Sequence, residues 1–168
     1  MRWDELGEQD CSLARTVSVL GDRWTLLILR DCFLRVRRFE DFQFRLGIGR
    51  AILADRLQKL VDAFVLTKVA YQQSPTRYEY RLTPKGLDLH PVIMAMVHWG
   101  DAHMADRKGP PAVHVHRSCG REFHPVMTCS ECREPIEPRQ VEVRPGPSAK
   151  ADSSPYFVTG TAAVRPTT

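Results

Sequence analysis

The spacing of apolar residues over the first 64 positions predicts four helices. Apolar side chains recur three and four residues apart in residues 11–20 and again in residues 24–33. The same spacing continues from Phe39 in a short third helix, which ends at the turn formed by residues 46–49. Residues 50–63 form the fourth predicted helix, in which one face is free for recognition and the other carries Ile52, Leu53, Leu57 and Leu60.

After residue 64 the apolar period changes to two. Residues 65–71 and 77–82 alternate on either side of a polar turn, which predicts a β-hairpin. Thr83 and Pro84 then suit the N-cap and first position of a long helix that runs to about Met104. This helix carries more apolar residues than one core face needs, so we expect a subunit interface there; they are Leu89, Ile93, Met96, Val97 and Trp99.

Two helices, a turn-linked helix pair and a hairpin predict a mainly α fold with a small β-hairpin, the winged helix-turn-helix. In this fold the second helix of the pair enters the DNA major groove and the hairpin flanks it. A small helical domain that is merely basic is the alternative. Proline and glycine usage predicts three parts: a winged-helix domain over residues 1–108, a small Cys/His segment over 109–143, and a disordered tail over 144–168.

Composition and charge narrow the class of protein. The 168 residues are 43% hydrophobic and 26% charged, with no apolar run long enough to span a membrane and no N-terminal signal, so we expect a cytoplasmic protein without a membrane partner. Residues 35–81 carry ten basic and five acidic side chains. That balance suits an anionic partner, although a solvated helix face would look similar. We find no catalytic motif, and we predict that the protein is not an enzyme.

Residues 11–100 resemble the HxlR-type winged-helix transcriptional regulators of bacteria, relatives of the MarR group. Several motifs carry the resemblance in order. They are Cys11-Ser-Leu-Ala-Arg-Thr, Leu20-Gly-Asp-Arg-Trp-Thr-Leu-Leu-Ile-Leu-Arg, Arg37-Arg-Phe-Glu-Asp-Phe, Leu53-Ala-Asp-Arg-Leu-Gln-Lys-Leu and Tyr78-Glu-Tyr-Arg-Leu-Thr-Pro-Lys-Gly. The resemblance implies a homodimer, formed through the first and last helices, that binds a pseudo-palindromic operator in double-stranded DNA, usually as a repressor.

The resemblance also implies roles for individual residues. The base-facing candidates on the reading helix are Arg50, Ala54, Asp55 and Gln58. The candidates for phosphate contacts are Arg37, Arg38, Arg56 and Arg77. Two positions depart from the family pattern: Gly49 replaces the usual helix-capping serine, and Phe64 replaces the glycine that ends the reading helix. A non-glycine at position 64 must accept or alter an awkward turn at a cost of about 1 kcal/mol.

Three of the five cysteines lie in the C-terminal third of the chain, in a pattern that suits zinc. His116, Cys119, Cys129 and Cys132 supply one imidazole and three thiolates, a donor set for a structural, tetrahedral Zn²⁺ in a zinc-ribbon-like segment. His114 or His124 could replace His116, because spacing alone does not select among them. A Cys129–Cys132 redox pair, or a segment that has lost its metal, are the alternatives.

Cys11 begins the first predicted helix, where the helix dipole favours the thiolate. In several HxlR-type regulators a cysteine at this position senses oxidants or electrophiles, so the resemblance makes Cys11 a redox-sensing candidate. A half-buried residue at a helix start is the equal alternative, and Cys32 is expected in the core. For the whole protein, the alternative function is a protein-interaction adaptor that keeps the winged helix and the zinc segment without binding specific DNA.

Overall fold

The computed structural model describes residues 5–148. Contacts divide the chain into two compact units, one of them Thr16–Pro125 and the other Met1–Arg15 with Val126–Thr168. The first unit contains the helical domain and the wing.

The four helices predicted for the first 64 residues are confirmed to within two residues at each end. A short 3-10 helix, η1 (Leu6–Glu8), precedes them. The second helix has a side-chain cap, because Asp22 Oδ1 accepts hydrogen bonds from the backbone N–H groups of Trp24 at 2.9 Å and Thr25 at 3.3 Å. The helices are α1 (Ser12–Leu20), α2 (Arg23–Phe33), α3 (Phe39–Leu46) and α4 (Arg50–Asp62).

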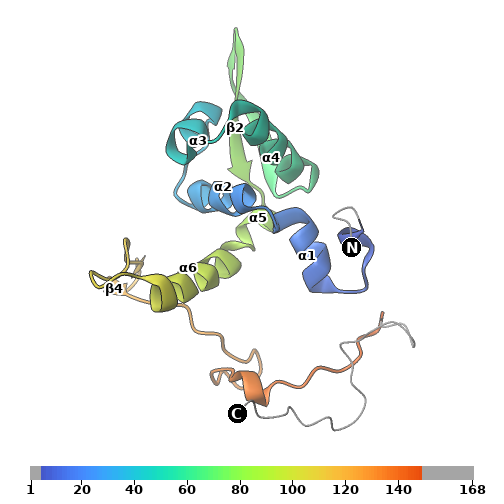
Figure 1. Ribbon diagram of the computed structural model, residues 1–168, viewed down its shortest axis with the longest axis vertical. Coiled ribbons are helices and arrows are strands. Elements are labelled where there is room, and N and C mark those ends of the chain that lie inside the picture. The colour runs from blue at the N-terminus through green and yellow to red at the C-terminus, as the bar shows by residue number, and fades with distance from the viewer. Residues whose placement is uncertain (1–4, 149–168) are drawn as a thin grey trace. The chain divides into compact units, whose positions relative to one another are not determined.

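The predicted hairpin is present as β1 (Leu66–Gln73) and β2 (Thr76–Leu82), an antiparallel pair with a bulge between Ala70 and Gln72. It projects beyond α3 and α4 as a wing (Figure 1). The connection between α2 and α3 lies along β2, because the Tyr80 N–H donates to the carbonyl of Arg37 at 2.8 Å and Arg38 pairs with Glu79. The base of the wing is thereby tied to the helical core.

The long last helix predicted from Pro84 to Met104 is wrong as a single element. The structure divides it into α5 (Pro84–Leu87) and α6 (His90–Met104). Pro91 accounts for the break, since its ring lacks an N–H and clashes with the carbonyl four residues earlier, at Leu87. The predicted start is confirmed: the Thr83 hydroxyl accepts a hydrogen bond from the Gly86 N–H at 3.0 Å.

The core of this unit lies among α2, α3, α4, the start of β1 and α6. The largest fully buried apolar side chains of this core are Phe42, Ile28, Leu29, Leu53, Leu57, Leu60 and Leu66. Ile52 was expected on the buried face of α4, but it is 44% exposed. In an ideal helix Ile52 lies beside Leu53 at an angle of about 100°, so the buried stripe on α4 is narrower than predicted.

One carboxylate lies inside this core. Asp31 on α2 is fully buried, and its two oxygens meet Arg30 at 2.8 Å and Arg45 at 3.0 Å. Arg45 belongs to the last turn of α3. The Asp31–Arg45 ion pair therefore fixes the end of α3 against α2, just before the turn that leads into α4.

No helix of residues 5–148 is both long and apolar enough to cross a membrane.

Candidate nucleic-acid interface and cysteine turns

One face of α4 is available to a partner. Leu53, Leu57 and Leu60 are buried, and the opposite face is exposed. All four predicted base-facing side chains lie on the exposed side: Arg50, Ala54, Asp55 and Gln58. The helix therefore packs through one stripe and leaves the predicted reading residues in solvent.

Contacts along α3 and α4 hold the polar reading residues. The Arg50 guanidinium lies over the Phe39 ring, 5.1 Å from its centre, and 3.4 Å from the side-chain oxygen of Gln43. The Gln58 amide donates to the carboxylate of Asp62 at 2.8 Å. Both contacts are exposed, so DNA could exchange for them at low cost.

Arg56 occupies a different environment from the other predicted contacts. Its Nε lies 2.9 Å from Asp22 Oδ1, a terminal guanidinium nitrogen lies 3.2 Å from Oδ2, and a further ion pair joins it to Asp55. The Arg56 guanidinium holds the pKa of Asp22 below its usual range, with help from the two capping N–H groups of α2 and against the effect of burial. Arg56 therefore joins α4 to the start of α2, and its predicted phosphate contact remains a prediction.

The remaining predicted phosphate contacts lie around the wing. Arg77 is exposed near the tip of the hairpin, in the second position of β2. Arg38 lies over the Tyr71 ring at 4.6 Å and 3.6 Å from Glu79, while Arg37 is exposed beside it. The fold thus places cationic side chains on the wing and at its base, within the same unit as α4.

The turn from α4 into the wing bears out the expectation for Phe64. This residue adopts the left-handed conformation, with φ at +57°, and its side chain is 74% exposed. The Thr83 hydroxyl donates to the Phe64 carbonyl at 2.7 Å, and Lys85 Nζ donates to the Ala63 carbonyl at 2.8 Å. These contacts hold a backbone conformation that glycine would adopt without strain.

Sequence reasoning did not identify Gly86 as a packing residue. A side-chain carbon at this position would lie 2.2 Å from the Val65 carbonyl oxygen, so α5 approaches the start of the wing more closely than any larger residue allows. The Thr83-Pro84-Lys85-Gly86 segment therefore caps α5 and makes two hydrogen bonds to the backbone that follows α4. Its glycine also lets α5 lie close to the Val65 carbonyl. The pattern of turn residues in the sequence signalled only the cap.

His116 and Cys119 lie in one tight turn between β3 (Val115–His116) and β4 (Arg121–Glu122). The His116 carbonyl accepts from the N–H groups of Cys119 at 3.3 Å and Gly120 at 2.8 Å, and Gly120 has φ at +69°. The Cys119 sulfur lies 3.5 Å from His116 Nδ1. This turn brings one imidazole and one thiol together.

Cys129 and Cys132 lie in a second turn of similar design. The Cys129 carbonyl accepts from the Arg133 N–H at 3.0 Å, and Arg133 has φ at +66°. The backbone N–H groups of Cys132 and Glu131 lower the pKa of the Cys129 thiol. Backbone N–H groups directed at sulfur favour thiolate, which is the form that ligates zinc.

The zinc site itself remains a prediction. Within residues 5–148 no three His, Cys, Asp or Glu side chains are grouped closely enough to hold a metal ion. His114 and His116 both meet the edge of the Phe123 ring, and His124 stacks on His98 with ring centres 5.0 Å apart. Of the three, His116 shares a turn with Cys119.

The two N-terminal cysteines differ in their surroundings. Cys11 immediately precedes α1 and is half-buried; its carbonyl accepts from the Arg15 N–H at 3.0 Å. Its proposed redox role is untested by the structure. Cys32 lies in the core as expected, and burial raises its pKa to about 12.

The helix-turn-helix, the exposed face of α4 and the adjoining wing define a winged helix-turn-helix protein. Residues 19–108 match the family model described as HxlR-like helix-turn-helix. The chain is 42% identical over 140 residues to the uncharacterized HTH-type transcriptional regulator Rv3095 of Mycobacterium tuberculosis, covering 83% of this chain and 89% of the relative. The chain therefore belongs to the HxlR-like helix-turn-helix family.

Solved structures support the same fold. The crystal structure of PA1607, described as a candidate transcription factor, has a TM-score of 0.75 and 32% identity, covering 82% of this chain and 96% of that one. The reduced form of the redox regulator HypR has a TM-score of 0.51 and 26% identity, covering 55% of this chain and 92% of that one. The family and these relatives are transcriptional regulators and not enzymes, and this protein is a transcriptional regulator with a helix-turn-helix DNA-binding domain.

Proposed function

We propose that this protein is a homodimeric repressor that binds a pseudo-palindromic operator. The observation that carries the proposal is the division of α4 into a buried stripe and an exposed face that holds Arg50, Ala54, Asp55 and Gln58. An exposed helix of this kind is the element that reads base edges in the major groove. Arginine and glutamine are side chains that can make paired hydrogen bonds to guanine and adenine, respectively.

The wing supplies the electrostatic part of the proposed interface. Arg77 near the tip and Arg37 and Arg38 at the base are exposed, and contacts from such residues to phosphates position a protein on DNA. Each neutralised phosphate makes the affinity more dependent on salt. We therefore assign positioning to the wing arginines and sequence discrimination to α4.

Exposed apolar surface supports dimerisation through the first and last helices. On α6 the side chains of Met96 and Trp99 are 49% and 59% exposed, and on α1 Leu13 is 70% exposed. Two copies joined through these helices would present two α4 helices, which a pseudo-palindromic site requires. Repression follows in this account from occupation of the operator.

We further propose that oxidation or alkylation of Cys11 regulates DNA binding. Cys11 lies at the start of α1, where the helix dipole favours thiolate, and α1 belongs to the proposed dimer interface. HypR, whose name describes a redox regulator, is similar over 55% of this chain. A chemical change at Cys11 would act on the geometry of the dimer and hence on the spacing of the reading helices.

The experiment that tests the proposal is fluorescence-anisotropy binding to duplexes that tile the region upstream of the protein's own gene. We expect one duplex to bind at least about 1,000-fold more tightly than scrambled DNA. The logarithm of its affinity should fall with the logarithm of salt concentration by about 0.9 for each neutralised phosphate. Equal, weak binding to every duplex and to wider genomic fragments would contradict operator recognition and favour the adaptor function.

A further inference from the structure

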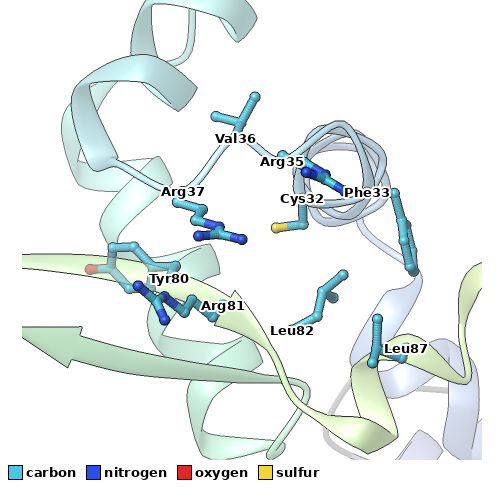
Figure 2. Close-up of a pocket in the computed structure, with 9 residues that line it drawn as sticks. All are labelled: Cys32, Phe33, Arg35, Val36, Arg37, Tyr80, Arg81, Leu82 and Leu87. Carbon is cyan, nitrogen blue, oxygen red and sulfur yellow. The ribbon is translucent and has the colours of Figure 1, made fainter.

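A cavity of about 310 Å³ lies beside the base of the wing, away from the exposed face of α4. It is open to solvent and is lined by the end of α2, the α2–α3 connection, β2 and α5 (Figure 2). Its lining is divided by chemistry. Cys32, Phe33, Leu82 and Leu87 form a mainly apolar part with Arg35 at its border, and Arg37 and Arg81 lie on the side of Tyr80.

The backbone around the cavity is defined by hydrogen bonds. Arg35 adopts the left-handed conformation with φ at +66°, and its N–H donates to the Cys32 carbonyl at 2.9 Å. The chain therefore reverses direction after α2 and runs back along β2. The bond from the Tyr80 N–H to the Arg37 carbonyl then fixes Arg37 next to the strand that carries Arg81.

Positive charge is in excess at this side of the cavity. Three guanidinium groups, those of Arg37, Arg38 and Arg81, surround one carboxylate, Glu79. Arg81 lies 3.0 Å from Glu79 and Arg38 lies 3.6 Å from it, and Arg81 is the largest cause of the lowered pKa of that carboxyl group. Because one negative charge meets three positive charges, a further anion would be bound favourably here.

Away from Arg37 and Arg81 the lining is mainly apolar, with Arg35 as a charged side chain beside Cys32 and Phe33. Cys32 is 8% exposed, and burial, reinforced by the neighbouring Asp31 carboxylate, keeps its thiol protonated at neutral pH. The Asp31 carboxylate is itself fully buried and paired with Arg30 and Arg45. A ligand group placed against Cys32, Leu82 and Leu87 would therefore gain from burial of apolar surface.

We propose that this cavity binds a small organic acid, with its carboxylate between Arg37 and Arg81 and its apolar body against Cys32, Leu82 and Leu87. The volume is near the lower end of the range of about 300–1,000 Å³ for ligand pockets, so the body is short, on the order of eight carbon atoms. An inorganic anion would leave the apolar part empty. The amphipathic lining is what distinguishes the two ligands.

Binding at this site also has a consequence for DNA, and this part rests on the proposed function. Arg37 lines the cavity and is also a predicted phosphate contact. A carboxylate held by Arg37 competes with DNA phosphate for the same guanidinium. The acid and the operator should therefore weaken each other's binding by the same factor, as linkage requires.

The test is isothermal titration calorimetry of the full chain with octanoate as the probe. We expect saturable binding, one octanoate per chain, that Arg81→Gln weakens about tenfold, because the variant lacks one of the two guanidinium groups that hold the carboxylate. Leu87→Trp fills the apolar part from an exposed position and should abolish the binding. Arg77→Gln removes an arginine from the same strand outside the cavity and should leave octanoate affinity unchanged.

Phosphate at matched ionic strength and 1-octanol separate the two halves of the proposal. Neither should compete with octanoate at comparable concentration, because each matches only one half of the lining. The proposal would be overturned if octanoate did not bind or if phosphate competed as well as octanoate. It would also be overturned if the Arg81→Gln and Leu87→Trp variants bound octanoate as tightly as the parent does. Calorimetry measures the acid without DNA, so its result is independent of whether the operator proposal holds.

Discussion

Arg56 on α4 and Asp22 at the start of α2 form a two-point ion pair, with nitrogen–oxygen distances of 2.9 and 3.2 Å. Asp22 also caps α2 through the N–H groups of Trp24 and Thr25. The Asp22 carboxylate therefore caps the N-terminus of α2 and also holds α4 through Arg56. Since α4 carries the proposed base contacts, the orientation of the reading face depends on this pair, which Arg56 also links to Asp55 on that face.

This pair predicts a defined loss of stability in acid. The folded protein holds the pKa of Asp22 below its ordinary value, so the stabilisation is fully present above about pH 4 and is lost as the pH falls through the folded value. We expect Asp22→Asn to be less stable than the parent at neutral pH, with a difference that shrinks below about pH 4. Urea unfolding of both proteins from acid to neutral pH measures the difference in their free energies of unfolding. The same difference at every pH would contradict a stabilising role for the Asp22–Arg56 ion pair.

The buried carboxylate of Asp31 predicts a larger loss. Asp31→Asn keeps the shape of the side chain but removes the charged partner of Arg30 and Arg45, whose side chains are 43% and 45% exposed, and the loss of a charged hydrogen bond typically costs roughly 1.5–3 kcal/mol. Glu142→Gln is the matched control, because Glu142 pairs with Arg144 on the surface and such pairs contribute about 0–1 kcal/mol. Urea unfolding compares them, and similar losses for the two variants would refute the structural role of Asp31.

The left-handed Phe64 predicts a substitution that stabilises the protein. Phe64→Gly relieves the strain at φ +57° while removing a side chain that is 74% exposed, and the gain should be about 0.5–1 kcal/mol. Gly86→Ala is the opposite case, because its added carbon would meet the Val65 carbonyl at 2.2 Å. Thermal unfolding should place the first variant above the parent and the second below it; the reverse order for Phe64→Gly would show that its side chain packs in solution.

The zinc content of cysteine variants tests the predicted ligand set. We expect the purified chain to carry about one zinc ion, and we expect Cys119→Ser and Cys129→Ser each to lose it. Cys32→Ser should retain the ion, because Cys32 is buried in the helical core. Elemental analysis of reduced protein gives the answer directly. A metal-free parent, or full zinc content in Cys129→Ser, would favour the Cys129–Cys132 redox pair or a segment without metal.

The proposed role of Cys11 predicts that oxidants release DNA from the parent protein and not from a variant that lacks this cysteine. Operator-bound parent protein treated with a quinone or with hypochlorite should release DNA, and Cys11→Ser should remain bound under the same treatment. Cys32→Ser is the control, since a thiol whose pKa is raised to about 12 by burial reacts slowly at neutral pH. Equal release of DNA from the parent and from Cys11→Ser would eliminate Cys11 as the sensor.

Local patterns predicted most of the fold. Helical spacing placed α1 to α4, alternation placed the wing, and Thr83 with Pro84 placed the start of α5. The break between α5 and α6 was missed although Pro91 was visible, because the apolar pattern continues across it. The exposure of Ile52 was missed because periodicity defines a face without giving its width.

Long-range pairing explains what the sequence did not reveal about the site. Asp22 and Arg56 are 34 residues apart, and no spacing rule connects an N-cap with a residue on the reading helix. The roles of Asp31 and Gly86 likewise depend on which elements approach each other in space. The exposed face of α4 was predictable from the helix period, and the resemblance to the HxlR-type regulators then selected Arg50, Ala54, Asp55 and Gln58 on it.

The measurement that most directly tests sequence recognition by α4 is operator affinity for Arg50→Ala combined with Gln58→Ala. Because both side chains are exposed and their contacts are local, the variant should fold as the parent does, which circular dichroism verifies. Operator affinity should fall at least about tenfold, with affinity for scrambled DNA much less affected. Arg107→Ala, an exposed arginine outside the proposed interface, should bind the operator as the parent does. Parent-like operator affinity and discrimination in the double variant would contradict recognition by α4.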